Sequence, residues 1–248
     1  MLDIIDWVVD SMAIMISFAA FSAALPLSGR GRIALAGGVG AWVGLAAFAG
    51  AEGALAFAPE QPVPLVGVFF AVPLAATAAL WFSSQRFREA LLAIPTPLLI
   101  GVNSMRVLGA LFLGLAAVGR LSGPFPYSAG LGDIITGVVA APLALALARG
   151  RTGLEVSIRA WNIFGALDLF AAVGFGLTSA EGSPVQIFHV GAGSAAMQQL
   201  PFSLVPTVLV PFYLITHGIV AAQLAARRRS DQSARSTTPG TPIATRAW

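Results

Sequence analysis

The sequence contains no cysteine and no lysine among its 248 residues. Without cysteine the chain has no thiolate nucleophile, no disulfide, no thiolate metal site and no covalent c-type haem. Without lysine it cannot form an imine with pyridoxal phosphate or retinal. A count of seven helices would therefore not make it a microbial rhodopsin. All 14 basic residues are arginine.

Histidine is almost as scarce. His189 and His217 are the two histidines, too few for a three-histidine zinc site. The sequence also lacks an Asp-rich motif for Mg²⁺-diphosphate, and it lacks Walker and kinase motifs. We therefore expect no metal and no cofactor.

Charged residues are few. They make up 10% of the chain, against about 25% in a typical soluble domain. Hydrophobic residues make up 57%, and the mean hydropathy is +0.83. A soluble protein of this length could not bury so much apolar surface in one core. The composition therefore predicts an all-α integral membrane protein whose first partner is the lipid bilayer.

The apolar residues form about seven runs, each long enough to cross some 30 Å of hydrocarbon. This pattern predicts a polytopic transmembrane domain over residues 1–226, in a bacterial cytoplasmic membrane. The segment 227–248 is rich in Ser, Thr, Pro and Arg, and we expect a disordered, basic cytoplasmic tail there. The expected spans are residues 7–27, 33–51, 64–82, 98–118 (with 91–97 as a broken lead-in), 131–148, 158–177 and 202–226.

Loop charge predicts the orientation of these spans. Ten arginines fall in alternate loops and the start of the tail, whereas Arg120 is the one arginine in the remaining loops. Arginine is enriched in cytoplasmic loops, so the N-terminus is expected outside and the C-terminus inside. The same loop placement argues against nucleic acid as a partner, in spite of the net charge of +3.

Small residues and prolines occur inside the spans. Gly40 and Gly44 form a GxxxG pair, which allows close helix approach. We expect this pair to pack within the chain, and we keep open an oligomer formed through the same face. Prolines 201, 206 and 211 fall within or beside one span, which predicts a real irregularity in that helix.

Ionisable side chains lie inside the predicted spans, where each costs about 2.5–3.5 kcal/mol on insertion scales. Arg106, Asp168 and His217 fall at comparable depth, and Asn103 shares a helix face with Arg106. An ion pair between Arg106 and Asp168 is the arrangement of lowest energy. Such a layer is either a structural pair or a substrate and proton site, and both interpretations stay open.

A second, outer layer is expected to be acidic. Asp133 lies among glycines at the start of the fifth predicted span, where a carboxylate caps a helix or faces a cavity. Asp10 and Glu52 are expected at similar depth, and the long loop 178–200 is a candidate lid. The candidate substrate-binding residues of both layers are Asn103, Arg106, Asp133, Asn162, Asp168, Tyr213 and His217.

These residues support several functions. The leading hypothesis is binding or transport of a small solute, with Arg106 recognising an anionic group and with proton coupling through Asp168 and His217. The alternative is a metal-independent intramembrane enzyme that acts on a lipid or isoprenoid, with Asp133, Asp168 or His217 as acid or base. A third hypothesis is a membrane sensor or assembly factor with a structural charge cluster.

Overall fold

The structure is a computed structural model that describes residues 2–57 and 65–237, with the backbone alone at residues 2–6, 8–10, 231 and 233–237. The described residues form helices and no strand. Six helical segments are long and apolar enough to cross a membrane. The prediction of an all-helical chain with several apolar helices is therefore confirmed.

The helices follow one another with mostly short connections. Two of the six apolar segments are composite: Thr96–Ala117 joins α5, η1 and α6, and Val205–Ser230 joins η3 to most of α9. In α1 the apolar part is Ser11–Ala24. The elements are α1 (Leu2–Ala24), α2 (Gly29–Ala51), α3 (Leu65–Ser83), α4 (Gln85–Leu92), α5 (Thr96–Gly101), η1 (Val102–Gly109), α6 (Ala110–Ala117), α7 (Phe125–Ala148), α8 (Glu155–Ser179), η2 (Ala195–Gln198), η3 (Val205–Leu209) and α9 (Val210–Thr237).

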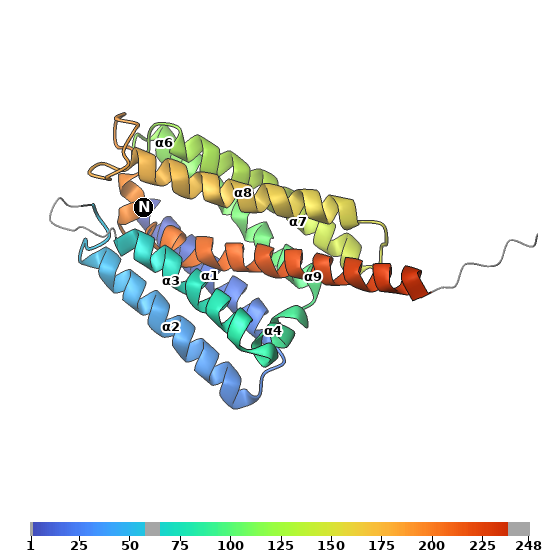
Figure 1. Ribbon diagram of the computed structural model, residues 1–248. Coiled ribbons are helices and arrows are strands. Elements are labelled where there is room, and N and C mark those ends of the chain that lie inside the picture. Colours follow the sequence, from blue (N-terminus) through green and yellow to red (C-terminus); the bar gives the residue numbers. More distant parts are fainter. Residues whose placement is uncertain (1, 58–64, 238–248) are drawn as a thin grey trace, which may run out of the picture.

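Helix α9 is the centre of the bundle. It runs between α3 on one side and α8 on the other (Figure 1). In the most apolar window of the segment Val205–Ser230, 67% of the residues are buried, against 17% in α2 and 6% in α3. Thr216, His217 and Gln223 of α9 are therefore held inside the protein, whereas α2 and α3 expose apolar side chains over most of their surface.

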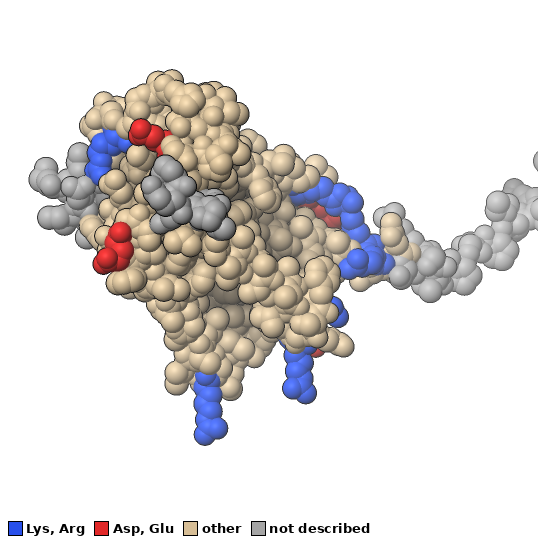
Figure 2. All heavy atoms as spheres, turned by 60° about the vertical axis from the view of Figure 1, so that its left-hand side comes forward, with Lys and Arg blue, Asp and Glu red and all other residues tan. Residues whose placement is uncertain are grey.

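The ends of the long helices gather at the two ends of the bundle (Figure 1). Charged side chains cluster toward these ends and leave the visible surface between them uncharged (Figure 2). The Arg-rich end carries Arg30, Arg32, Arg86, Arg88, Arg149, Arg151, Arg159, Arg227, Arg228 and Arg229. We call the other one the opposite end, and Glu52, Arg120 and Glu181 lie there.

Two helix boundaries differ from the expected ones. Helix α7 begins at Phe125, six residues before the expected start, because Pro126 is tolerated in the first turn and Gly130 and Gly132 continue the helix. Helix α9 continues to Thr237, through the first half of the expected disordered tail. No proline or glycine interrupts the sequence between Arg227 and Pro239. Residues 238–248 lie outside the described part.

The irregularity predicted from the prolines is present. Residues Val205–Leu209 form a π-helix at the start of the last apolar segment. Pro211 has no N–H to offer the Thr207 carbonyl, four residues earlier, and the indole Nε1 of Trp42 donates to that oxygen at 3.1 Å. Trp42 thus has a hydrogen-bonding role in addition to packing on Phe69, with ring centroids 5.0 Å apart.

The expectation that Gly40 and Gly44 pack within the chain is wrong. Among the described residues, no atom outside their own helix lies within 4 Å of a Cβ built on Gly37, Gly38, Gly40 or Gly44. These glycines are exposed on α2. On the same helix, Gly50 does mediate close packing, since a Cβ there would lie 2.5 Å from Oγ of Ser203. Other close-packed glycines lie around the buried charges.

Candidate functional site

Arg106 lies at the centre of a buried polar cluster. It sits on η1, a 3-10 segment in the middle of an apolar helix, and its side chain is 1% exposed. Nε donates to Oδ1 of Asp133 at 2.6 Å, and NH2 donates to Oδ2 of Asp168 at 2.5 Å. NH1 donates to the carbonyl of Gly165 at 3.1 Å. All three guanidinium nitrogens are therefore engaged by the protein.

The ion pair expected between Arg106 and Asp168 is present, but a second carboxylate joins it. Asp133 was expected at a helix start in a separate outer layer, and this is wrong. It is the ninth residue of α7, more than two turns inside the helix, and it binds the same guanidinium as Asp168. The cause is the early start of α7, which carries Asp133 down to the level of Arg106.

His217 completes the cluster from α9. Its Nε2 lies 3.2 Å from NH1 of Arg106, and its Nδ1 lies 2.9 Å from Oδ1 of Asn162. Because arginine has no acceptor, Nε2 must accept and the proton must be on Nδ1. The Asn162 amide also donates to the His217 carbonyl at 3.2 Å. The imidazole is therefore a neutral acceptor with a fixed tautomer.

Glycines make room for these side chains. A Cβ built on Gly165 would lie 2.6 Å from Cε1 of His217, and one on Gly132 would overlap the Asp168 carboxyl group. One on Gly109 would overlap Asp133, and one on Gly137 would lie 2.6 Å from the backbone nitrogen of Val107. Four glycines at the contact points thus let three helical segments approach the charges. The sequence shows these glycines, but not what they face.

The other candidate residues surround the cluster. The Tyr213 ring centroid lies 6.0 Å from the Arg106 guanidinium carbon. Asn103 is fully buried and donates to the Leu99 carbonyl at 2.9 Å and to the Thr216 hydroxyl at 3.1 Å. It shares η1 with Arg106, but it serves the α5–α9 contact.

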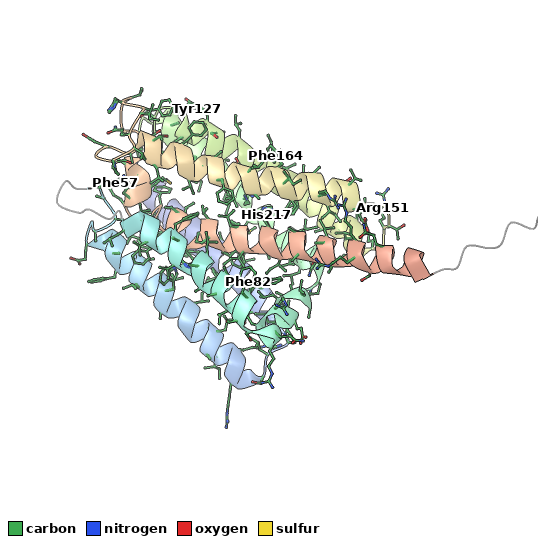
Figure 3. The ribbon with its side chains drawn as sticks, viewed as in Figure 1. Phe57, Phe82, Tyr127, Arg151, Phe164 and His217 are labelled. Carbon is green, nitrogen blue, oxygen red and sulfur yellow. The ribbon has the colours of Figure 1, made fainter. Side chains whose placement is uncertain are left out.

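Trp161 was missed among the candidates. Its ring centroid lies 4.9 Å from that of His217, and its indole donates to the Thr136 carbonyl at 3.0 Å. Figure 3 shows His217 inside the bundle, between α8 and α9, whereas Phe164 on the same helix as Trp161 projects from the surface. Trp161 therefore closes the cluster on the side toward the Arg-rich end.

A cavity of about 210 Å³ lies beside the cluster, toward the opposite end. Its walls come from α3, α6, α7, α8, η3 and the start of α9, and residues of the loop 180–204 close it. Among the described residues, Asp133 is the one charged residue that lines it, and Ser194 and Gln198 are polar and neutral. The other lining residues are Phe57, Val66, Gly67, Phe70, Phe112, Phe125, Ala129, Leu169, Ala172, Val173, Gly176, Leu177, Ala180, Met197, Val205, Pro206 and Val210.

A second, smaller cavity of about 40 Å³ lies against Arg106 and Tyr213. The two cavities share five lining residues, namely Phe112, Asp133, Leu169, Val205 and Val210. Asp133 therefore stands between the larger apolar cavity and the guanidinium, with a side chain that is 15% exposed.

The loop over the opposite end is anchored. Ser194 donates to the Gly176 carbonyl at 2.7 Å, and the backbone of Gly193 donates to the Ser122 hydroxyl at 2.7 Å. Ser122 in turn donates to the Val190 carbonyl. The loop therefore forms a fixed roof of the cavity, through Met197 and Gln198.

Glu52, which was expected in the outer layer, is not in the cluster, because it follows the last residue of α2 and is exposed. In the loop 178–200, His189 is also exposed. Asp10 was expected at the same depth, and its side chain lies outside the described part of the structure. The outer acidic layer is thus reduced, among the described side chains, to Asp133, which belongs to the Arg106 cluster.

Comparison with known proteins places the chain in a family. No curated protein and no solved structure matches it. The model of one family matches residues 62–225, which is more than half of the chain. The matched segment contains Arg106, Asp133, Asp168 and His217, but not α1 or α2. The chain belongs to this family, described as a domain of unknown function (DUF8737).

Proposed function

We propose that this protein binds a small, largely apolar molecule in the cavity beside Asp133 and carries it across the membrane. The observation that supports this is the cavity itself, about 210 Å³ in volume and lined mostly by apolar side chains, with the Asp133 carboxylate at its base in contact with Arg106. Ligand sites are commonly concave and apolar, with a few polar groups that orient the ligand. The cavity and the buried charges share one residue, so a ligand in the cavity would act on the charges directly.

Recognition of an anion by Arg106 has little support. The guanidinium is neutralised by two carboxylates, at 2.6 Å and 2.5 Å, and its side chain is 1% exposed. An anionic ligand that reached the cavity would meet the Asp133 carboxylate first. The polar group of the ligand is therefore expected to be neutral or positively charged.

The test compares a cavity-filling variant with a matched control on the same helix. Ala172→Phe places a large ring in the cavity wall, and Ala160→Phe places the same ring on the exposed side of α8. The probes are benzyltrimethylammonium, its neutral isostere neopentylbenzene, and phenylacetate. We expect at least one probe to raise the melting temperature of the wild type and of Ala160→Phe, but not of Ala172→Phe. Equal shifts in both variants, or none in the wild type, would contradict the proposal.

The enzyme hypothesis draws on the same geometry. An apolar cavity that ends at a carboxyl group also suits acid or base chemistry on a lipid or isoprenoid, with Asp133 as the catalytic candidate. Incubation of the purified protein with isoprenoid alcohols and membrane lipid extract, followed by mass spectrometry, separates the two functions. New products that Asp133→Asn fails to form would favour the enzyme, and uptake into vesicles without chemical change would favour the transporter.

We also propose seven spans in a bacterial cytoplasmic membrane, with the N-terminus outside. Helix α1 has 23 residues, as has α2, and the Arg-rich end fits the cytoplasmic side. Because the chain has no cysteine, single cysteines report sidedness directly. A membrane-impermeant maleimide added to intact cells should label Asp3→Cys and Glu181→Cys but not Arg151→Cys. Labelling of Arg151→Cys in intact cells, or protection of Asp3→Cys, would refute this topology.

A further inference from the structure

The buried cluster holds one negative charge in excess. Arg106 is the one cation in contact with it among the described side chains, and Asp133 and Asp168 are both within hydrogen-bond distance of that guanidinium. His217 is a neutral acceptor, since its Nε2 faces an arginine nitrogen. One positive and two negative groups therefore share a site whose side chains are between 1% and 15% exposed.

A net charge at that depth has to be balanced. An unpaired buried ion costs several kcal/mol even after relaxation, and more in a membrane interior. The described titratable and charged side chains that face the cluster are Arg106 on η1, Asp133 on α7, Asp168 on α8, and Tyr213 and His217 on α9. These side chains include no second cation. The missing positive charge is therefore supplied by a proton on a carboxyl group or by a cation from outside.

Asp133 is the carboxylate that a cation from the cavity would reach. Its Oδ1 accepts from Arg106, whereas Oδ2 has no hydrogen-bond partner among the described residues. It lines both cavities, and its side chain is 15% exposed, about twice the 7% of Asp168. Asp168 does not line either cavity.

The walls of the larger cavity suit an organic cation. Four phenylalanines line it, at positions 57, 70, 112 and 125, and the remaining polar groups, Ser194 and Gln198, are neutral. Aromatic faces attract a desolvated cation through the negative face of the ring. Within the described part of the chain no arginine lines this cavity, and the sequence has no lysine, so no described side chain in its wall repels a positive charge.

We propose that the ligand of this site is a small monovalent organic cation, which exchanges for one proton held between Asp133 and Asp168. This inference rests on the proposed function, because it assigns the ligand class of the same cavity. With the cavity empty, the proton balances the excess charge. When the cation binds at Asp133, that charge is balanced by the ligand and the proton leaves. Arg106 stays in place, held by the Gly165 carbonyl and His217, and keeps the two carboxyl groups coupled.

The experiment is titration calorimetry of the purified, lipid-embedded protein with benzyltrimethylammonium and with neopentylbenzene. Repeating each titration in two buffers of different ionisation enthalpy gives the number of protons released. We expect about one proton released per bound cation, and binding of the cation at least about thirtyfold tighter than binding of the neutral isostere.

Acid-to-amide variants locate the exchange. Asp133→Asn keeps an oxygen acceptor for Arg106 and leaves the cluster neutral, so it should fold, lose the proton release and lose the preference for the cation. Asp168→Asn also leaves the cluster neutral but keeps the Asp133 carboxylate on the cavity. It should release no proton. Glu52→Gln makes the same chemical change at an exposed site away from the cavity, and it should behave as the wild type.

The outcomes separate this inference from the proposed function. If neopentylbenzene binds, Ala172→Phe abolishes that binding, and the cation binds no more tightly, the cavity is a ligand site but the inference is wrong. Cation binding without proton release also overturns it, as does unchanged release from folded Asp133→Asn. If neither probe binds, the proposed function and the inference both fail.

Discussion

Nε of Arg106 lies 2.6 Å from Oδ1 of Asp133, although the two residues are 27 positions apart in the sequence and belong to different helical segments, η1 and α7. This contact turns a simple ion pair into a site with one guanidinium and two carboxyl groups. It also connects the buried charges to the apolar cavity, because Asp133 lines that cavity and Asp168 does not. The arrangement predicts how the protein responds to changes at each position.

Loss of the Arg106 guanidinium should destabilise the bundle. Arg106→Met leaves two buried carboxyl groups without their shared partner, and we expect a loss of about 3–5 kcal/mol in the free energy of unfolding. Arg30→Met, at an exposed position of α2, should change it by less than about 0.5 kcal/mol. Denaturant unfolding in a mild detergent, followed by far-UV circular dichroism, measures both.

Neutralising the whole cluster should restore folding. The triple variant Arg106→Met, Asp133→Asn and Asp168→Asn contains no buried charge at this site, so most of the stability lost in Arg106→Met should return. Cation binding should stay absent in this variant. Retained binding in the folded triple variant would show that the charges are not part of a ligand site.

Glycine 165 should not tolerate a side chain. A Cβ at Gly165 would lie 2.6 Å from Cε1 of His217, so Gly165→Ala forces the imidazole off Arg106. We expect a loss of about 1–3 kcal/mol from this overpacking. Gly174→Ala, on the same helix with no atom outside that helix within 4 Å of its Cβ, should be neutral or raise stability by up to about 1 kcal/mol. Thermal unfolding of the pair distinguishes a packing role from simple helix propensity.

The indole N–H of Trp42 should contribute to the stability of the protein. Trp42→Phe retains the aromatic contact with Phe69 but removes the donor to the Thr207 carbonyl, to which Pro211 offers no N–H. Leaving a buried carbonyl without this donor should cost about 1–3 kcal/mol. Trp81→Phe, a half-buried indole near the end of α3, serves as the control. Equal melting temperatures for the two variants would contradict a hydrogen-bonding role.

Gln223 should stabilise the short connection between α4 and α5. Its amide donates to the Leu92 and Ile94 carbonyls at 3.1 Å and 2.7 Å, and its oxygen accepts from Thr96 at 2.7 Å. Gln223→Leu should therefore cost about 1–3 kcal/mol, whereas Gln232→Leu, exposed on the same helix, should have little effect. Amide hydrogen exchange at residues 91–97 should rise in the first variant alone.

Much of the architecture was predictable from residue patterns. The apolar runs gave the helices because an apolar segment of about 20 residues in a charge-poor chain has no other stable environment. Pro206 and Pro211 predicted the irregular start of the last apolar segment, because proline has no N–H to donate to the carbonyl four residues earlier. The pairing of Arg106 with Asp168 followed from the cost of leaving either charge alone.

The wrong placement of Asp133 has a physical cause in its flanking glycines. Pattern reasoning placed the start of the fifth span at residue 131, because Gly130 and Gly132 are poor helix formers in isolation. Tertiary packing overrides that preference here, since Gly132 must lack a Cβ for Asp168 to fit and Gly130 lies against Gly109. The same glycines that obscured the helix are the ones that bring its carboxylate to Arg106. In α2, by contrast, Gly40 and Gly44 resembled a packing motif but meet no neighbour in the described chain.

The sequence by itself determined that the chain is helical and apolar, which side chains had to be buried as ions, and which loops carry arginine, because these follow from composition and from distance along the chain. Only the tertiary structure decided that Asp133 shares the Arg106 guanidinium, that Nε2 of His217 accepts from this guanidinium, and that an apolar cavity ends at the Asp133 carboxylate. These features depend on how four helical segments come together, and that contact is set by side-chain volumes at Gly109, Gly132, Gly137 and Gly165, not by the pattern of any one helix.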